Sequence, residues 1–161
     1  MKKMSLLLAA VMAVSMLSGC NGDNSSTSAE SREQGAVIKN PAEKTAELLT
    51  AVEHPEMVEV SSDKLEVYYG ISADAVNEYS AYVCGSGAMP DEFGVFVATD
   101  SDKAEEIGTA LEQRIEKQRA TYADYTPAEM YKFDDSFVAV QGELVYYAVC
   151  ADNTSAKDIL G

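Results

Sequence analysis

The sequence predicts an α+β domain, built from a small antiparallel sheet of about four strands in two hairpins with one long helix packed across a face. Two observations carry this prediction. Two pairs of β-rich runs are each joined by a short turn-like segment, and a long amphipathic stretch lies between the pairs. Hairpins imply antiparallel pairing, and a sheet with one apolar face needs a helix to cover it. The predicted domain spans residues 40–161, which is enough for one core and too short for two lobes that close on a ligand.

The first predicted element is a short amphipathic helix that starts at Asn40. Asn40 is a good N-cap residue, Pro41 suits the first helical position, and His54-Pro55 ends the pattern. Residues 57–71 carry weak strand signals around a turn-like Ser61-Ser62-Asp63, and residues 72–78 predict one or two helical turns capped by Ser72.

The first hairpin is predicted from "YSAYVC" and "EFGVFVAT", which flank the loop "GSGAMPD". In the second of these runs Phe93, Val95 and Val97 face one way and Phe96 and Ala98 the other. A strand that is apolar on both sides should lie in the centre of a sheet.

Residues 100–122 predict the long helix. Acidic side chains crowd its first turns, basic ones lie toward its far end, and an apolar stripe should pack on the sheet. The stripe consists of Ala104, Ile107, Leu111, Ile115 and Tyr122. After a linking segment, residues 137–140 and 144–150 form a second predicted hairpin that turns at residues 141–143, and residues 153–160 predict a short terminal helix.

The amino-terminal segment resembles the leader of bacterial lipoproteins. Lys2 and Lys3 precede the apolar run Leu6–Val14, which is shorter than the roughly 20 residues that span a bilayer. Leu17-Ser18-Gly19-Cys20 matches the lipobox, in which the cysteine is diacylated and the chain is cut just before it. We therefore expect a signal peptide over residues 1–19 and lipidation of Cys20. An ordinary signal peptide with a cysteine near its cleavage site is the alternative.

Residues 20–39 join this anchor to the predicted domain through a flexible polar spacer, because their composition buries too little apolar surface to fold. Two acyl chains hold a protein stably on a membrane. The expected location is the extracytoplasmic face of the cell membrane.

The composition is strongly acidic and limits the classes of partner. Without the leader, ten basic residues oppose 27 acidic ones, a net charge of about −17. Such a charge disfavours nucleic acid and anionic lipid surfaces as partners of the protein face. The expected partners are the membrane, through its lipid anchor, and an envelope protein or a wall polymer.

Cys84 and Cys150 both end apolar runs. A disulfide between them is permitted outside the cytoplasm and would stabilise the fold by about 4 kcal/mol on the loop-entropy model. Two buried free thiols are the preferred interpretation, because the sequence does not show whether the two Cα atoms approach each other.

The stretches "VYYGISADAVNEYSAY", "GAMPDEFGVFVATDSDKAEEI" and "YTPAEMYKFDDSFVAVQGELVYYAV" are similar to the domain-of-unknown-function family DUF4358. The similarity covers roughly residues 45–160. It implies a lipid-anchored envelope protein of the kind found in Gram-positive gut anaerobes. It supplies no functional residues, and no role attaches to Asp91-Glu92.

The residues contain no complete catalytic, cofactor or metal motif, so no catalytic residue, metal ligand or cofactor is predicted. His54 lacks a ligand partner at metal spacing, and Asp100-Ser101-Asp102 fits helix capping better than a calcium loop. Tyrosine pairs at 68–69 and 146–147 suit a binding face, although alternation should place one member of each pair in the core.

The expected function is a non-enzymatic binding or structural module. The alternative is a small cell-wall or polysaccharide hydrolase that pairs Glu92 with a carboxylate from another strand. Two partly buried carboxyl groups in a concave pocket would favour the enzyme.

Overall fold

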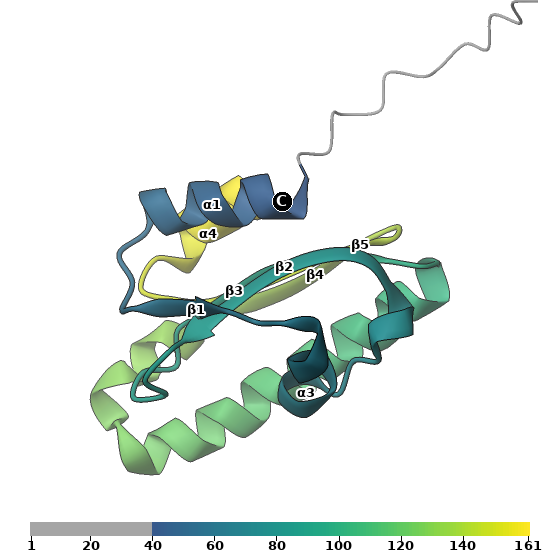
Figure 1. Cartoon of the computed structure of the whole chain (residues 1–161). Coiled ribbons are helices and arrows are strands. Elements are labelled where there is room, and N and C mark those ends of the chain that lie inside the picture. Colours follow the sequence, from purple (N-terminus) through teal and green to yellow (C-terminus); the bar gives the residue numbers. More distant parts are fainter. Residues whose placement is uncertain (1–39) are drawn as a thin grey trace, which may run out of the picture. The chain divides into compact units, whose positions relative to one another are not determined.

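The computed structural model describes residues 40–161, and these residues form one α+β unit. A five-stranded antiparallel sheet, ordered β1-β2-β3-β5-β4, has helices on both faces. Figure 1 shows α1 and α4 side by side on one face and α3 running beneath the other. The predicted leader, the lipidation site Cys20 and the spacer lie outside the described residues.

The elements follow one another along the chain with short connections. The strands are β1 (Met57–Glu59), β2 (Val76–Cys84), β3 (Glu92–Ala98), β4 (Phe137–Gln141) and β5 (Leu144–Val149). The α-helices are α1 (Pro41–Ala51), α2 (Leu65–Tyr69), α3 (Ser101–Tyr125) and α4 (Asn153–Leu160). The 3₁₀ helices are η1 (Ser62–Lys64), η2 (Ala73–Ala75) and η3 (Pro127–Phe133).

The α+β class, the antiparallel pairing and the long helix are confirmed, but the sheet has five strands rather than four. The fifth strand, β1, pairs with β2 through Met57 opposite Cys84. It lies at the edge and its residues are half-buried or exposed, so no apolar alternation marks it in the sequence. The helical turns predicted at residues 72–78 shrink to η2, because β2 already begins at Val76.

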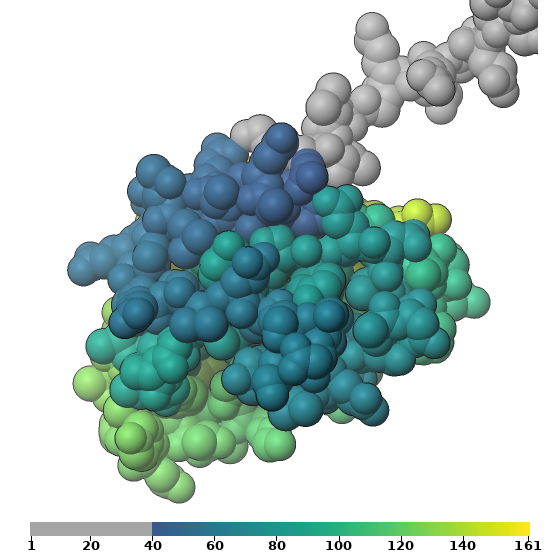
Figure 2. All heavy atoms as spheres, viewed as in Figure 1, coloured from purple at the N-terminus to yellow at the C-terminus, as the bar shows by residue number. Residues whose placement is uncertain are grey.

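The central strand β3 separates two apolar cores, as its two apolar sides predict. Phe93 and Val95 pack under α1 and α4, and Phe96 and Ala98 pack toward α3. Figure 2 shows α1 along the top of the face in view, with the teal residues of the following elements below it.

α1 and α3 begin with the caps that the sequence indicates, whereas the predicted cap Ser72 makes no capping hydrogen bond to η2 through its side chain. The Asn40 side chain accepts a hydrogen bond from the N–H of Ala42, and the Asp100 side chain accepts one from the N–H of Lys103. Asp152 caps α4 in the same way through the N–H of Ser155. Asp100 therefore begins a helix, as predicted, and Gly142, at a φ of 62°, supplies the left-handed residue that the β4–β5 turn requires.

The tyrosine pairs behave differently from each other. Tyr68 is exposed and Tyr69 buried, but both lie in the helix α2 rather than in a strand, so strand alternation is not what separates them. Tyr146 and Tyr147 of β5 are both buried. The expectation for the second pair was wrong because β5 lies next to the central strand and both of its faces are covered by helices.

Candidate functional site

Two adjacent buried carboxylates lie where the β2–β3 loop ends and β3 begins. Asp91 and Glu92 are each 1% exposed. Each carboxylate is paired with a cation from a different helical segment, Glu92 with Arg114 of α3 and Asp91 with Lys132 of η3. Burying a charge is tolerated when it is paired and hydrogen-bonded, so these two residues fasten α3 and η3 to the same end of the sheet.

The Glu92–Arg114 pair is held by several hydrogen bonds. Nε of Arg114 donates to both carboxylate oxygens, at 3.0 Å to Oε1 and 2.8 Å to Oε2, and Nη2 also donates to Oε2. Nη1 donates to the carbonyl oxygen of Tyr68 at 2.6 Å. The guanidinium also lies over the ring of Tyr69, 4.8 Å from its centroid. Arg114 thus joins α2, α3 and β3.

Burial raises the pKa of Glu92, and the charge and hydrogen bonds of Arg114 oppose that rise. The guanidinium keeps its charge at any physiological pH. A neutral Glu92 would leave this guanidinium, whose side chain is 16% exposed, without a counter-ion, so the pair is ionised at neutral pH.

Asp91 belongs to a second group of charges. The Nζ of Lys132 lies 2.7 Å from Oδ2 of Asp91 and 2.8 Å from Oε2 of Glu129. The side chains of Lys132 and Asp91 are 6% and 0% exposed, and burial raises the pKa of Asp91. The second oxygen, Oδ1, is buried and has no hydrogen-bond partner among the described residues.

A cavity of about 250 Å³ opens beside these carboxylates, and we call it the Arg114 cavity. It is lined by Tyr68, Val83, Cys84, Gly87, Met89, Pro90, Asp91, Glu92, Arg114, Gln118 and Tyr122. The hydroxyl of Tyr122 donates to the carbonyl oxygens of Gly87 and Met89, both at 2.9 Å, and so ties the β2–β3 loop to α3.

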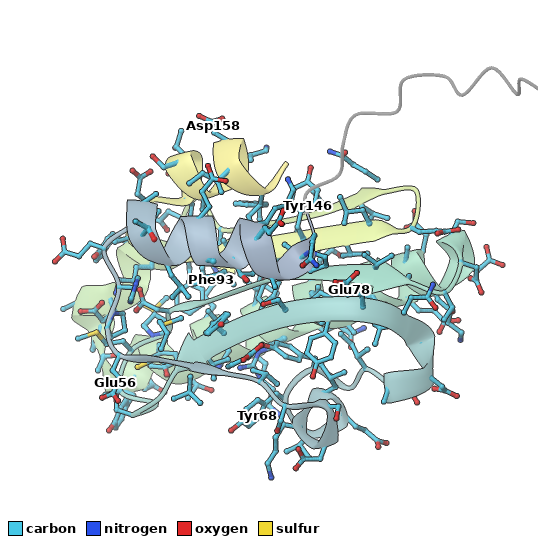
Figure 3. The ribbon with its side chains drawn as sticks, turned by 45° about the horizontal axis from the view of Figure 1, so that its top comes forward. Glu56, Tyr68, Glu78, Phe93, Tyr146 and Asp158 are labelled. Carbon is cyan, nitrogen blue, oxygen red and sulfur yellow. The ribbon has the colours of Figure 1, made fainter. Side chains whose placement is uncertain are left out.

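A second hollow of about 430 Å³ lies between α2 and α3, and we call it the α2–α3 groove. It shares Tyr68, Arg114 and Gln118 with the Arg114 cavity and adds Gln113 and Lys117 of α3. Figure 3 shows Tyr68 projecting outward, whereas Phe93 and Tyr146 lie beneath α1 and α4. Because they share these residues, the Arg114 cavity and the α2–α3 groove adjoin each other. The exposed side chain of Tyr68 lines both.

The two cysteines flank Asp91 on opposite strands, and both thiols are free. The N–H of Cys84 donates to the carbonyl of Asp91, while Cys150 follows Val149, which pairs with Glu92 from the other side. Two strand spacings, about 10 Å, therefore separate them, whereas a disulfide requires Cα atoms closer than about 7 Å.

The two thiols differ in their surroundings. Burial raises the pKa of Cys84, but hydrogen bonds from Ser86 and from backbone N–H groups of the loop oppose it and lower the pKa overall. Burial raises the pKa of Cys150 to about 11. Cys84 lines the Arg114 cavity and is the more acidic thiol.

The residues that the sequence singled out differ in whether they lie at a cavity. Asp91 and Glu92 both line the Arg114 cavity, but they are neighbours in the chain rather than acids from two strands, and each is paired with a cation rather than set opposite the other as in a glycosidase. His54 makes local hydrogen bonds to the carbonyl oxygens of Leu49 and Pro55. Within residues 40–161 no three His, Cys, Asp or Glu side chains gather as metal ligands, and no helix has the length and apolarity of a membrane span.

The sequence reasoning missed Arg114, Lys132 and Gln118. One signal could have found Arg114. It follows Ile107 by seven residues and Leu111 by three, so a basic residue stands on the buried face of α3. A cation in an apolar stripe implies a buried acid opposite, and "DE" at the start of the central strand was the available acid.

A family model described as "Domain of unknown function (DUF4358)" matches residues 50–150. The match includes the Arg114 cavity, the α2–α3 groove and both buried ion pairs. No curated protein and no solved structure matches the chain.

Proposed function

The chain belongs to the DUF4358 family of domains of unknown function, and we propose that it is a lipid-anchored, extracytoplasmic binding module whose α2–α3 groove holds a segment of a wall polymer. The observation that carries the proposal is the row of residues around Tyr68. An exposed aromatic ring stands beside the amides of Gln113 and Gln118 and the ammonium of Lys117.

These residue types suit a polyhydroxylated ligand. A tyrosine ring offers a rigid apolar platform with a polar tip, and amide and cationic side chains supply hydrogen bonds around it. The paired Arg114 fixes the wall of the groove, because its hydrogen bond to the carbonyl of Tyr68 holds the end of α2. A site that is largely preformed loses less free energy to ordering when it binds.

A binding role has more support than a hydrolytic one. Glu92 is 1% exposed and ionised beside Arg114, so it has no proton to give to a leaving group and no open path to a sugar carbon. Asp91 is tied to Lys132 in the same manner through one oxygen. The proposed activity is therefore recognition without bond cleavage.

The proposed location rests on the leader and on Cys20. The lipobox at residues 17–20 supplies the anchor, and the charge of about −17 keeps the domain away from anionic lipid. We expect Cys20→Ala to move the protein from the membrane fraction to the soluble fraction. Continued pelleting of this variant with membranes would contradict the anchor.

The ligand is tested by cosedimentation with purified, insoluble cell-wall material. The full chain should pellet with the wall, and Tyr68→Ala should reduce the bound fraction at least tenfold, as expected when a central aromatic contact is removed. Tyr125→Ala is the matched control, because Tyr125 is also exposed, at 67%, but lines neither hollow. Equal binding by wild type and Tyr68→Ala would overturn the assignment of the groove.

A further inference from the structure

Lys132 and Asp91 form a deeply buried pair with an unusual deficit of hydrogen bonds. Nζ lies 2.7 Å from Oδ2, and the two side chains are 6% and 0% exposed. Oδ1 of the same carboxylate has no partner among the described residues. A buried carboxylate that makes only part of its hydrogen bonds is costly, and the cost falls if the group loses its charge.

The third member of the cluster is Glu129, one turn before Lys132 in η3. Its Oε2 lies 2.8 Å from Nζ, and its side chain is 22% exposed. Glu129 thus contacts the amine and reaches solvent at the same time. A carboxylate in this position can take a proton from the amine and return it to a neighbouring oxygen.

The amine is also close to the carboxyl carbon. A nitrogen that lies 2.7 Å from one carboxylate oxygen lies about 3.5 Å from the carbon, the separation of a near-attack arrangement. Both side chains are held from opposite ends of a 41-residue stretch, one at the start of β3 and one in η3. The fold therefore brings a nucleophile, an electrophile and a proton carrier together, with the amine and the carboxylate buried and the carrier partly exposed.

We propose that Lys132 and Asp91 join in an intramolecular isopeptide bond, with Glu129 as the proton carrier. Transfer of a proton within the pair gives a neutral amine and a carboxylic acid. Nζ attacks Cγ of Asp91, the Nζ–Cγ bond forms and Glu129 accepts a proton from Nζ.

The same proton passes to the departing hydroxyl, the Cγ–O bond breaks and one water leaves. The product is a secondary amide that keeps one N–H and one C=O. The step needs no oxidant and no added reactant, and it removes two charges from the interior. The isopeptide bond goes beyond the proposed binding function, because it does not depend on a ligand in the Arg114 cavity or in the α2–α3 groove.

The test is peptide mass spectrometry on the purified full chain. Proteolysis should yield a branched peptide that contains both residues, with a mass about 18 Da below the sum of the two linear peptides because one water is lost. Fragmentation should place the branch at Lys132 and Asp91. The exposed pair Lys103–Glu106, at 2.6 Å, is the matched control and should give linear peptides.

Two variants sharpen the test. Lys132→Arg should give linear peptides, and Glu129→Gln, which keeps the amine and the acid, should reduce the linked fraction at least tenfold. Linear peptides for both residues in the folded wild type after a day of incubation would overturn the proposal, as would a water loss that fragmentation places within the peptide of Asp91. A link that forms equally in urea-denatured chain would overturn the role assigned to the fold.

Discussion

Removal of Arg114 tests how the candidate site is held together. Arg114→Met leaves Glu92 buried, at 2% side-chain exposure, with no cation opposite. Breaking a buried pair from one side costs about 3 to 5 kcal/mol. With a urea m-value of roughly 2 kcal/mol/M for a domain of this size, the unfolding midpoint should fall by about 2 M.

The double variant separates charge from packing. In Glu92→Leu/Arg114→Met neither charge remains, so this protein should be more stable than Arg114→Met alone. Lowering the pH should also rescue the single variant, because protonation of the orphaned Glu92 removes its charge. The exposed pair Lys103–Glu106 serves as the control, and Lys103→Met should leave the midpoint nearly unchanged.

The assay is urea unfolding followed by circular dichroism at pH 7 and pH 5. Strictly additive effects of the Glu92 and Arg114 substitutions would refute the reasoning, because independent contributions mean that the two groups do not depend on each other. A small effect of Arg114→Met at pH 7, similar to that of Lys103→Met, would refute it as well.

Three further predictions concern other parts of the fold. In the native protein at pH 8, iodoacetamide should label Cys84 well before Cys150, because burial raises the pKa of Cys150 to about 11 while that of Cys84 is lowered; equal rates would contradict this assignment. Gly94→Ala should lower stability by about 1 to 3 kcal/mol in urea unfolding, because its Cβ would lie 2.8 Å from the Cβ of Ala81; an unchanged midpoint would show that β2 and β3 can separate. Hydrogen bonds from the N–H and hydroxyl of Ser155 hold the pKa of Asp152 below its ordinary 3.8, so its stabilisation is present above that value and is lost as the pH falls through the folded pKa. Asp152→Asn should lose this dependence in urea midpoints measured from pH 2 to pH 6, and an unaltered pH profile would speak against the cap.

Local chemistry explains what could be predicted of the fold. The start of α1, the capped start of α3 and the β4–β5 turn each depend on residues within four positions of one another, and all three are confirmed. The central place of β3 followed from its apolar residues on both sides. These features require no knowledge of distant parts of the chain.

The features that were missed depend on distant contacts. β1 is a three-residue edge strand whose only guide is its pairing with β2. Of the candidate site, Asp91-Glu92, Cys84 and the tyrosine pair that contains Tyr68 were singled out. The partners Arg114 and Lys132 were not, because they lie 22 and 41 residues away from Glu92 and Asp91. A buried carboxylate implies a cationic partner, but the spacing of residues along the chain does not identify which lysine or arginine it is.

The contact between α1 and α4 bears on how the domain would respond to force under the proposed lipid tether. Nζ of Lys44 donates to the carbonyl oxygens of Ile159 and Leu160, and Leu48 is fully buried in the same layer. α1 also packs directly on the sheet, where the hydroxyl groups of Thr45 and of Ser80 in β2 lie 2.7 Å apart. Tension that arrives through residue 40 therefore acts first on the packing of α1 against α4, β2 and β3. Because side-chain contacts hold α1 in place, α1 can detach while the backbone hydrogen bonds keep the strands of the sheet in register.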